Sequence, residues 1–222
     1  VPEGWIVKKP ENLSALEAMS IGTAGITAAA SVIKIIDSKP SSELPIMVTG
    51  ATGGVGSVAV MILSKLGFDV SALTGKREAK NFLTQLGATS ITLREDYLNE
   101  PSKPMVRPLF AGAVDTVGGS ILSKLLSEIA PHGVVSCCGD VGGIEINTTV
   151  FPFILRGINL CGIDSAESPI EFKESLWKKF ANEWRLDLSA STKEVSKEQL
   201  GEEIQIILQG GQQGRVVLNH KE

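Results

Sequence analysis

The 222-residue sequence predicts an α/β protein built on a doubly wound parallel sheet. Short apolar runs recur along the chain, and their starts lie about 21 to 24 residues apart, which accommodates one strand, one helix and two loops. Patterns typical of amphipathic helices fill most of the intervals. The runs are apolar along their whole length, as expected of strands that helices cover on both faces.

The first helix is expected at a capping box, Ser14-Ala15-Leu16-Glu17. The first strand is Ile46-Met47-Val48, which follows Pro45. A second helix follows, with apolar residues at helical spacing from Val55 to Leu66 and a glycine stop at Gly67.

Five further strands are expected to begin near Asp69, Ser90, Ala113, Val134 and Ile158. The clearest helices between them span 76–86 and 120–129. Two last helices are announced by the capping boxes Ser168–Glu171, with a proline at the first helical position, and Ser196–Gln199. Residues 187–192 form the expected loose connection.

Composition excludes several classes of protein. The net charge of −4 gives no basic excess for nucleic acid, no apolar stretch is expected to span a membrane, and no signal peptide is visible. The three cysteines, Cys137, Cys138 and Cys161, lie in apolar runs without metal-ligand spacing, which favours buried thiols in a reducing cytoplasm. His132 and His220 lie far apart, so no metal site is expected.

The glycine-rich segment Val48–Gly56, V-T-G-A-T-G-G-V-G, lies between a predicted strand and a predicted helix. Glycines let the backbone approach a phosphate closely, and the start of the helix offers free N–H groups with the positive end of the helix dipole. This context predicts a pyrophosphate site rather than a purely structural turn.

The end of the second predicted strand indicates which dinucleotide binds. NAD-binding folds carry an acid there for the ribose 2′-hydroxyl, whereas this chain has Thr74-Gly75-Lys76-Arg77. A hydroxyl, a free N–H and the charge of Lys76 or Arg77 suit a 2′-phosphate. The sequence therefore predicts NADPH as the cofactor.

Thr49–Gly56 also fits the T-G-x-x-x-G-x-G signature of short-chain dehydrogenases. That family needs a downstream Tyr-x-x-x-Lys and a glycine motif close to the N-terminus. The only tyrosine is Tyr97, Pro101 stands four positions later, and the glycine turn comes late. This family is therefore rejected.

The chain resembles the medium-chain dehydrogenase/reductase superfamily, in its zinc-free quinone-oxidoreductase branch and there the acrylyl-CoA reductase group. The resemblance covers essentially the whole chain. It rests on Ile21–Ala28 ahead of the glycine turn, on Ala113–Gly118, and most specifically on Phe151–Ile163 followed by Asp164-Ser165.

This resemblance implies a domain organisation. Residues 1–12 would be the stub of a GroES-like β domain expected before Val1, residues 13–168 the NADP-binding Rossmann core, and residues 169–222 the C-terminal helices and the return strand at Arg215–Leu218. The active-site tyrosine and most substrate contacts would belong to the absent GroES-like part, so no catalytic residue is expected in this chain.

The resemblance also implies cofactor contacts along the chain. The pyrophosphate would be held by Thr52, Gly53, Gly54 and Val55, and the 2′-phosphate by Thr74, Gly75 and Lys76. Ser90 falls where the family often has an arginine near the adenosine. The nicotinamide end would be lined by Asp140, Ile154 and Ser165, with Thr23 either there or packing inside a helix. Asp115 is expected to hydrogen-bond a neighbouring loop.

The activity implied is NADPH-dependent reduction of an α,β-unsaturated thioester, acryloyl-CoA to propanoyl-CoA, by hydride transfer without a metal. Two alternatives stay open: a reductase of quinones or enones, and a non-catalytic NADPH-binding module. The apolar edge strand Ile158–Ile163 predicts a homodimer, since a monomer would leave that edge unprotected.

Overall fold

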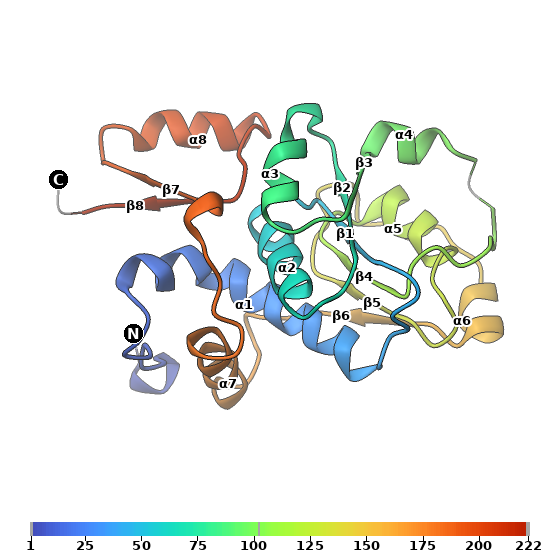
Figure 1. Cartoon of the computed structure of the whole chain (residues 1–222), viewed down its shortest axis with the longest axis horizontal. Helices are drawn as coiled ribbons and strands as arrows, with labels where there is room; N and C mark the ends of the chain where they lie inside the picture. Colours follow the sequence, from blue (N-terminus) through green and yellow to red (C-terminus); the bar gives the residue numbers. More distant parts are fainter. Residues whose placement is uncertain (1, 102, 221–222) are drawn as a thin grey trace.

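A computed structural model describes residues 2–101 and 103–220, and it confirms the predicted fold class. Six parallel strands form one sheet in the order β3-β2-β1-β4-β5-β6 (Figure 1). The strands are β1 Ile46–Thr49, β2 Val70–Thr74, β3 Ser90–Leu93, β4 Gly112–Asp115, β5 Val134–Cys137 and β6 Asn159–Gly162. Each begins within one residue of its predicted start.

Helices follow most strands and cover both faces of the sheet. They are α1 Ala15–Asp37, α2 Gly54–Lys65, α3 Lys80–Gln85, α4 Arg94–Asn99, α5 Gly119–Leu126, α6 Phe151–Arg156, α7 Ile170–Ala181 and α8 Leu200–Leu208. Short 3₁₀ turns lie at Glu3–Trp5, Arg77–Ala79 and Ser189–Ser191. The helix expected over 76–86 is therefore divided into a 3₁₀ turn and α3.

Alternate residues of the strands point to the two faces. Ile46 and Val48 belong to the apolar cluster that contains α1 and α2, whereas Met47 belongs to the cluster around α5. All three are at most 2% exposed. Burial on both faces explains why the strands read as continuous apolar runs.

Helix α1 begins at the predicted capping box, where the Glu17 backbone N–H donates to Ser14 Oγ and the Ser14 N–H to the Glu17 carboxylate. It bends at Gly22, whose φ of 49° and ψ of −158° are not helical. Contrary to expectation, α1 is long and apolar enough by length and composition to cross a membrane, with a mean hydropathy of 1.6. However, 61% of that apolar window is buried, because α1 is a core helix of this fold.

The last two predicted capping boxes differ from the structure. Helix α7 starts at Ile170 with Pro169 as its N-cap and no side-chain cap. Ser168 Oγ instead donates to the carbonyl of Asp164. Helix α8 starts at Leu200, so the contact between the Ser196 N–H and the Gln199 side chain lies one turn ahead of it.

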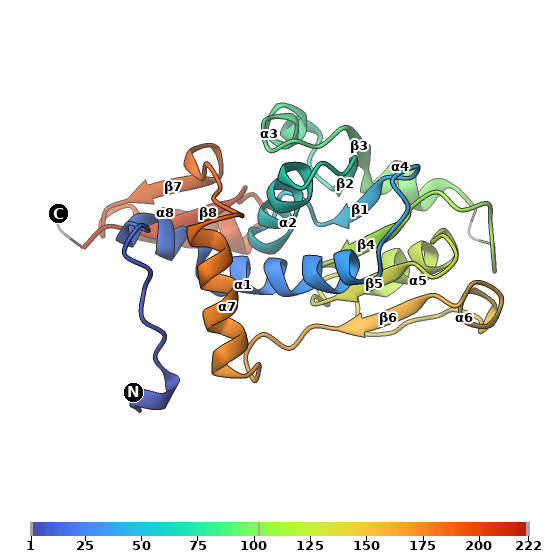
Figure 2. The same ribbon diagram turned by 60° about the horizontal axis from the view of Figure 1, so that its bottom comes forward.

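The C-terminal segment ends in a second, two-stranded sheet of β7 Thr192–Val195 and β8 Arg215–Leu218, which pair in parallel. Figures 1 and 2 show this sheet at one end of the molecule and α6 at the other. Phe180 of α7 packs into the same cluster as α1 and α2. The domain division at residue 168 stays a prediction.

Candidate functional site

The glycine turn joins the carboxyl end of β1 to the start of α2. Gly50 has a φ of 58°, and its carbonyl accepts the Gly53 N–H at 2.9 Å. Gly53 is the N-cap of α2 and supplies no side chain to the first turn. The first N–H groups of α2 are therefore available to an anion.

The turn after β2 lies directly beside the glycine turn. Thr52 Oγ1 and Thr74 Oγ1, both buried, are 3.4 Å apart, and the Lys76 N–H donates to Thr74 Oγ1 at 3.1 Å. Lys76 Nζ reaches the carbonyl of Gln212 in the segment ahead of β8. Partial burial lowers the pKa of Lys76, so an anion at this turn would favour its charged form.

Ser90 lies at the opposite end of β3 from the turn that follows β2. Ser90 is the first residue of β3 and pairs in register with Ser71, so it lies toward the amino ends of the strands. Arg94 follows the last residue of β3, which pairs with Thr74. A Cβ added to Gly75 would stand 2.9 Å from Arg94 Nη2, which places the guanidinium against the turn. Arg94, rather than Ser90, therefore lies beside the turn at the carboxyl ends of β2 and β3.

Arg215 is a second residue that the sequence reasoning missed. Its Nε donates to the carbonyl of Ser20 at 3.2 Å. A Cβ on Gly54 would lie 2.9 Å from its Nη1, and one on Gly22 would lie 3.2 Å from its Nη2. The guanidinium thus lies between the glycine turn and the bend of α1.

The segment before β8 is fixed to the turn by a hydrogen bond from the Gly214 N–H to the carbonyl of Thr52, at 2.9 Å. Burial lowers the pKa of Arg215, but a guanidinium stays charged in proteins. Sequence spacing gives no signal for the contact between Arg215 and the glycine turn, because more than 150 residues separate the turn from β8.

These placements fit a dinucleotide that carries phosphates at two positions. Gly54 and Gly75 each leave room for an arginine next to a β–α turn. Arg215 lies at the start of α2, and helix starts of this kind are common pyrophosphate sites. Arg94 and Lys76 lie at the turn after β2, where dinucleotide-binding folds hold the adenosine ribose. Guanidinium groups and backbone N–H groups are the usual donors to phosphate.

The residues expected at the nicotinamide end do not all lie at the same end of the strands. Asp140 follows β5 and is exposed, while Ser165 follows β6 and accepts a 2.7 Å hydrogen bond from Thr27 Oγ1 of α1. Ile154 lies on α6, which precedes β6, and is 68% exposed. Within one chain Ile154 therefore lies near the amino end of β6, whereas Ser165 lies near its carboxyl end.

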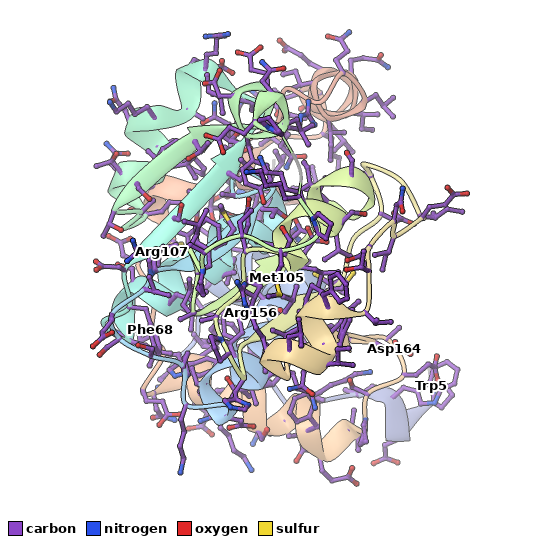
Figure 3. The ribbon with its side chains drawn as sticks, turned by 90° about the vertical axis from the view of Figure 1, so that its right-hand side faces the viewer. Trp5, Phe68, Met105, Arg107, Arg156 and Asp164 are labelled. Carbon is purple, nitrogen blue, oxygen red and sulfur yellow. The ribbon has the colours of Figure 1, made fainter. Side chains whose placement is uncertain are left out.

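Arg156 holds α6 at the amino ends of the strands. Its Nη1 donates to the carbonyls of Ser127 and Ile129, at 3.0 and 2.8 Å, and its Nη2 to that of Val106. Figure 3 shows Arg156 beside the Met105–Arg107 segment. Ser127 and Ile129 lie between α5 and β5, and Val106 lies ahead of β4. All three carbonyls are therefore near the amino ends of strands.

A hollow of about 540 Å³ opens next to Ser165 and the bend of α1. Its walls are mostly apolar, with Thr23, Met19, Ile26 and Trp177 among the residues that line it. Thr23 is exposed and lines this hollow, so its side chain is not packed in the protein interior. A site of this kind suits an apolar group held next to a polar loop.

Asp115, at the end of β4, is fully buried and serves the turns around it. Its carboxylate accepts from Thr49 Oγ1 at 2.7 Å and from the Gly118 N–H at 2.9 Å, which confirms the expected loop contact. Desolvation raises the pKa of Asp115. Burial also raises the pKa of Cys138, to about 11, so its thiol stays protonated and is a poor nucleophile.

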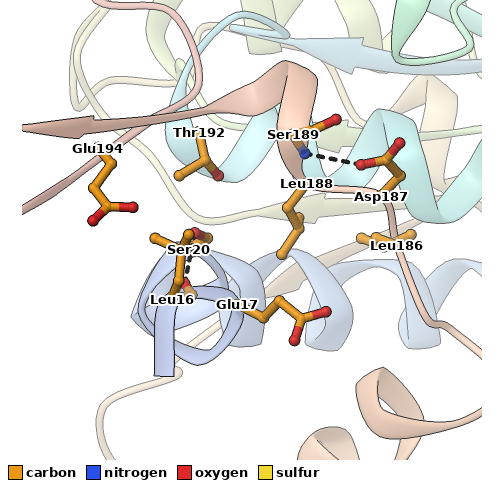
Figure 4. A pocket seen from close by; sticks show the side chains of 9 residues that line it. All are labelled: Leu16, Glu17, Ser20, Leu186, Asp187, Leu188, Ser189, Thr192 and Glu194. Atoms are coloured by element: carbon orange, nitrogen blue, oxygen red, sulfur yellow. Dashed lines mark hydrogen bonds between the residues drawn. The ribbon is translucent and has the colours of Figure 1, made fainter. Parts of the chain in front are cut away.

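A second hollow, of about 560 Å³, lies between the start of α1 and the Ser189–Thr192 segment (Figure 4). It contains none of the expected cofactor residues. Within residues 2–101 and 103–220, no three His, Cys, Asp or Glu side chains come together as metal ligands would.

Comparisons with known proteins place these features in a family. The family model described as zinc-binding dehydrogenase matches residues 54–182. The chain is 45% identical to the "Putative quinone oxidoreductase YhfP" of Bacillus subtilis, over 98% of this chain and 67% of that protein. It is 40% identical to the acrylyl-CoA reductase AcuI of Ruegeria pomeroyi, over 97% of this chain and 66% of that protein.

Solved structures agree with this assignment. The crystal structure of Bacillus subtilis yhfP with NAD bound has a TM-score of 0.93 at 44% identity and covers 99% of this chain and 68% of its own. The yhdH oxidoreductase of Salmonella enterica in complex with NADP has a TM-score of 0.92 at 36% identity, over 99% and 68%. The chain thus spans about two thirds of the length of these relatives.

Proposed function

Because the chain belongs to the zinc-binding dehydrogenase family, within the medium-chain dehydrogenase/reductases, we propose that it is the NADPH-binding part of a reductase of α,β-unsaturated substrates. The observation that carries this proposal is the pair of adjacent turns, Thr52–Val55 and Thr74–Lys76, each with an arginine against its glycine. The oxidoreductase relatives, one of which is solved with NADP, support the same cofactor.

The chain's residues would hold the cofactor at three points. The turn Thr52–Val55 would bind the pyrophosphate through the N–H groups of Gly54 and Val55, since the Gly53 N–H is donated to the Gly50 carbonyl. Arg215 would neutralise the pyrophosphate from β8. Lys76 and Arg94 would pair with the 2′-phosphate, while Thr74 orients the turn through its hydrogen bond from Lys76. Asp140 and Ser165 would lie at the nicotinamide end.

The proposed reaction is reduction of acryloyl-CoA to propanoyl-CoA. When bound, NADPH supplies the hydride, which goes to the β-carbon of the unsaturated thioester, and a proton at the α-carbon completes the product. The hydrogen bond between Thr27 and Ser165 would fix the loop after β6, and the apolar hollow beside it would exclude water from the acyl group. The acrylyl-CoA reductase among the relatives favours this substrate.

A reductase of quinones or enones is the second candidate function. It is favoured by the 45% identity to a protein named for quinone reduction. The same hydride would then go to an enone or quinone, without any need for a coenzyme A site. A non-catalytic NADPH-binding module is the third candidate.

We propose further that two copies pair through β6. It is an edge strand of the sheet, and apolar side chains on and near α6 are exposed: Val150 is 63%, Ile154 68% and Leu155 61% exposed. In an antiparallel pairing of two β6 strands, α6 of the second copy would lie near the carboxyl end of the first copy's β6. Ile154 could then line the nicotinamide end from the other subunit.

The test is turnover by the whole protein that carries this chain, followed through the loss of NADPH absorbance with acryloyl-CoA and with a simple quinone. Faster kcat/KM on acryloyl-CoA would support the thioester reductase, and faster turnover of quinone the second candidate. NADPH binding without turnover of either substrate would leave the binding module.

A further inference from the structure

The rim of the proposed 2′-phosphate site carries an ion pair. Arg77, in the 3₁₀ turn after Lys76, reaches the carboxylate of Glu95 in the first turn of α4. The pair connects the segments that follow β2 and β3, the two strands whose ends form the site. The two side chains are 73% and 54% exposed, so they can separate and move without disturbing the core.

The three cations at this rim differ in their partners. Lys76 is committed to the backbone carbonyl of Gln212. The Arg94 side chain lies against Gly75 and has no hydrogen-bond or ion-pair partner in the part of the chain that the structure describes. Only Arg77 has its charge neutralised by an acid in an ion pair. The charge that Arg77 could offer a phosphate is therefore balanced by Glu95.

We infer that Glu95 is a positioning residue for cofactor choice: it withholds Arg77 from the ribose 2′-phosphate and thereby limits the preference for NADPH over NADH. The inference rests on the proposed function, since it presupposes that a 2′-phosphate binds at Thr74–Lys76. It adds a determinant that works through Arg77 rather than by contact with the cofactor.

The physical argument is a competition between two anions for one guanidinium. A 2′-phosphate that recruits Arg77 must first displace the Glu95 carboxylate, whereas a 2′-hydroxyl makes no such demand. Exposed ion pairs are weak, and their measured strength corresponds to a factor of about 1.4 to 5 in an equilibrium constant. Removing the Glu95 charge should therefore tighten binding of 2′-phosphorylated ligands by up to about fivefold and leave the affinities for the other ligands unchanged.

The test compares Glu95→Gln with Asp96→Asn in the full chain. Asp96 is the next residue of α4, is also exposed and forms no ion pair among the described residues, so its variant controls for loss of one negative charge. Dissociation constants are measured by calorimetry at low salt for 2′,5′-ADP and 5′-AMP, and for NADPH and NADH. Thermal unfolding checks that both variants fold.

The expected result is tighter binding of 2′,5′-ADP and NADPH by Glu95→Gln beyond any gain in Asp96→Asn, with 5′-AMP and NADH unchanged. The gain should disappear in an Arg77→Met background, because the effect passes through Arg77. Equal effects of the two single variants, or a gain that survives Arg77→Met, would overturn the inference alone. Failure of the unaltered chain to bind 2′,5′-ADP or NADPH would instead overturn the proposed function, and this inference with it.

Discussion

The Arg215 guanidinium, at the start of β8, lies against Gly54 at the start of α2: a Cβ on Gly54 would stand 2.9 Å from its Nη1. The last strand thus contributes a cation to a turn that precedes it by more than 150 residues. The absence of a side chain at position 54 permits this approach. Gly54 thus makes room for a side chain, whereas Gly56 of the same motif lies against the backbone of Gly50.

Gly54→Ala should weaken cofactor binding without unfolding the protein. Its Cβ would meet the far end of the flexible Arg215 side chain, which can move aside. We expect NADPH affinity to fall about tenfold, the effect of losing about 1.4 kcal/mol of phosphate contacts, with little change in Tm. Calorimetry and thermal unfolding measure the two effects.

Gly56→Ala is the matched control in the same motif. Its Cβ would stand 2.3 Å from the backbone carbonyl oxygen of Gly50, which cannot move without distorting the turn. A cost of about 3 kcal/mol would lower Tm by roughly 6 to 12 °C in a domain of this size. Equal losses of stability in the two variants would contradict the assigned roles.

Arg215→Met should lower NADPH affinity by about ten- to a hundredfold, because hydrogen bonds to charged groups contribute about 1.5 to 3 kcal/mol. Lys193→Met provides the control: Lys193 lies on the neighbouring strand β7 and pairs with Glu203. Binding titrations at two salt concentrations should show a weaker salt dependence only for Arg215→Met. Unchanged affinity in that variant would remove Arg215 from the site.

The parallel sheet could be predicted from the sequence because its inner strands, β1, β2, β4 and β5, are buried on both faces. Continuous apolar runs such as Ile46–Val48 then repeat at the length of one βα unit. The turns at Thr52–Val55 and Thr74–Lys76 were also found, since local glycines and strand ends define them. These features depend on neighbours in the sequence.

The rest of the site depends on contacts between distant segments or on the exact end of a strand. The family resemblance predicts an adenosine contact at Ser90, the first residue of β3, whereas Arg94, at the carboxyl end of that strand, lies against Gly75. Ligands bind at the carboxyl ends of parallel strands, so the sequence does carry a signal for Arg94. Arg215 and the bend at Gly22 carry no such local signal.

Glu128 should make stability fall as pH rises. It is 2% exposed and accepts a 2.5 Å hydrogen bond from the Tyr97 hydroxyl, and desolvation raises its pKa. A raised folded-state pKa favours the protonated carboxyl, so this contribution is complete below about pH 4.5 and is lost as pH rises through the folded-state pKa.

Glu128→Gln retains an acceptor for Tyr97 but cannot ionise. We therefore expect its free energy of unfolding, relative to the unaltered protein, to increase from pH 5 to pH 8. Urea denaturation at several pH values measures this difference. A difference that stays constant across the range would show that the pKa of Glu128 is not raised.

Leu155→Glu should dissociate the proposed homodimer while leaving the monomer folded, since Leu155 is 61% exposed on α6. A charge buried between two copies would be strongly unfavourable, whereas a charge in solvent costs little. Leu208→Glu, at a 74% exposed position on α8, is the control that should not change the assembly. Sedimentation of both variants decides, and a monomer in the unaltered protein would exclude the dimer.

The central claim is that Thr74–Lys76 and Arg94 bind a 2′-phosphate, and calorimetric titration of the chain with NADPH and NADH tests it most directly. We expect NADPH to bind at least about tenfold more tightly, because at least one charge-assisted pair depends on the 2′-phosphate. Arg94→Met should reduce that ratio by weakening NADPH alone. Equal affinity for NADPH and NADH in the unaltered chain would contradict the assignment.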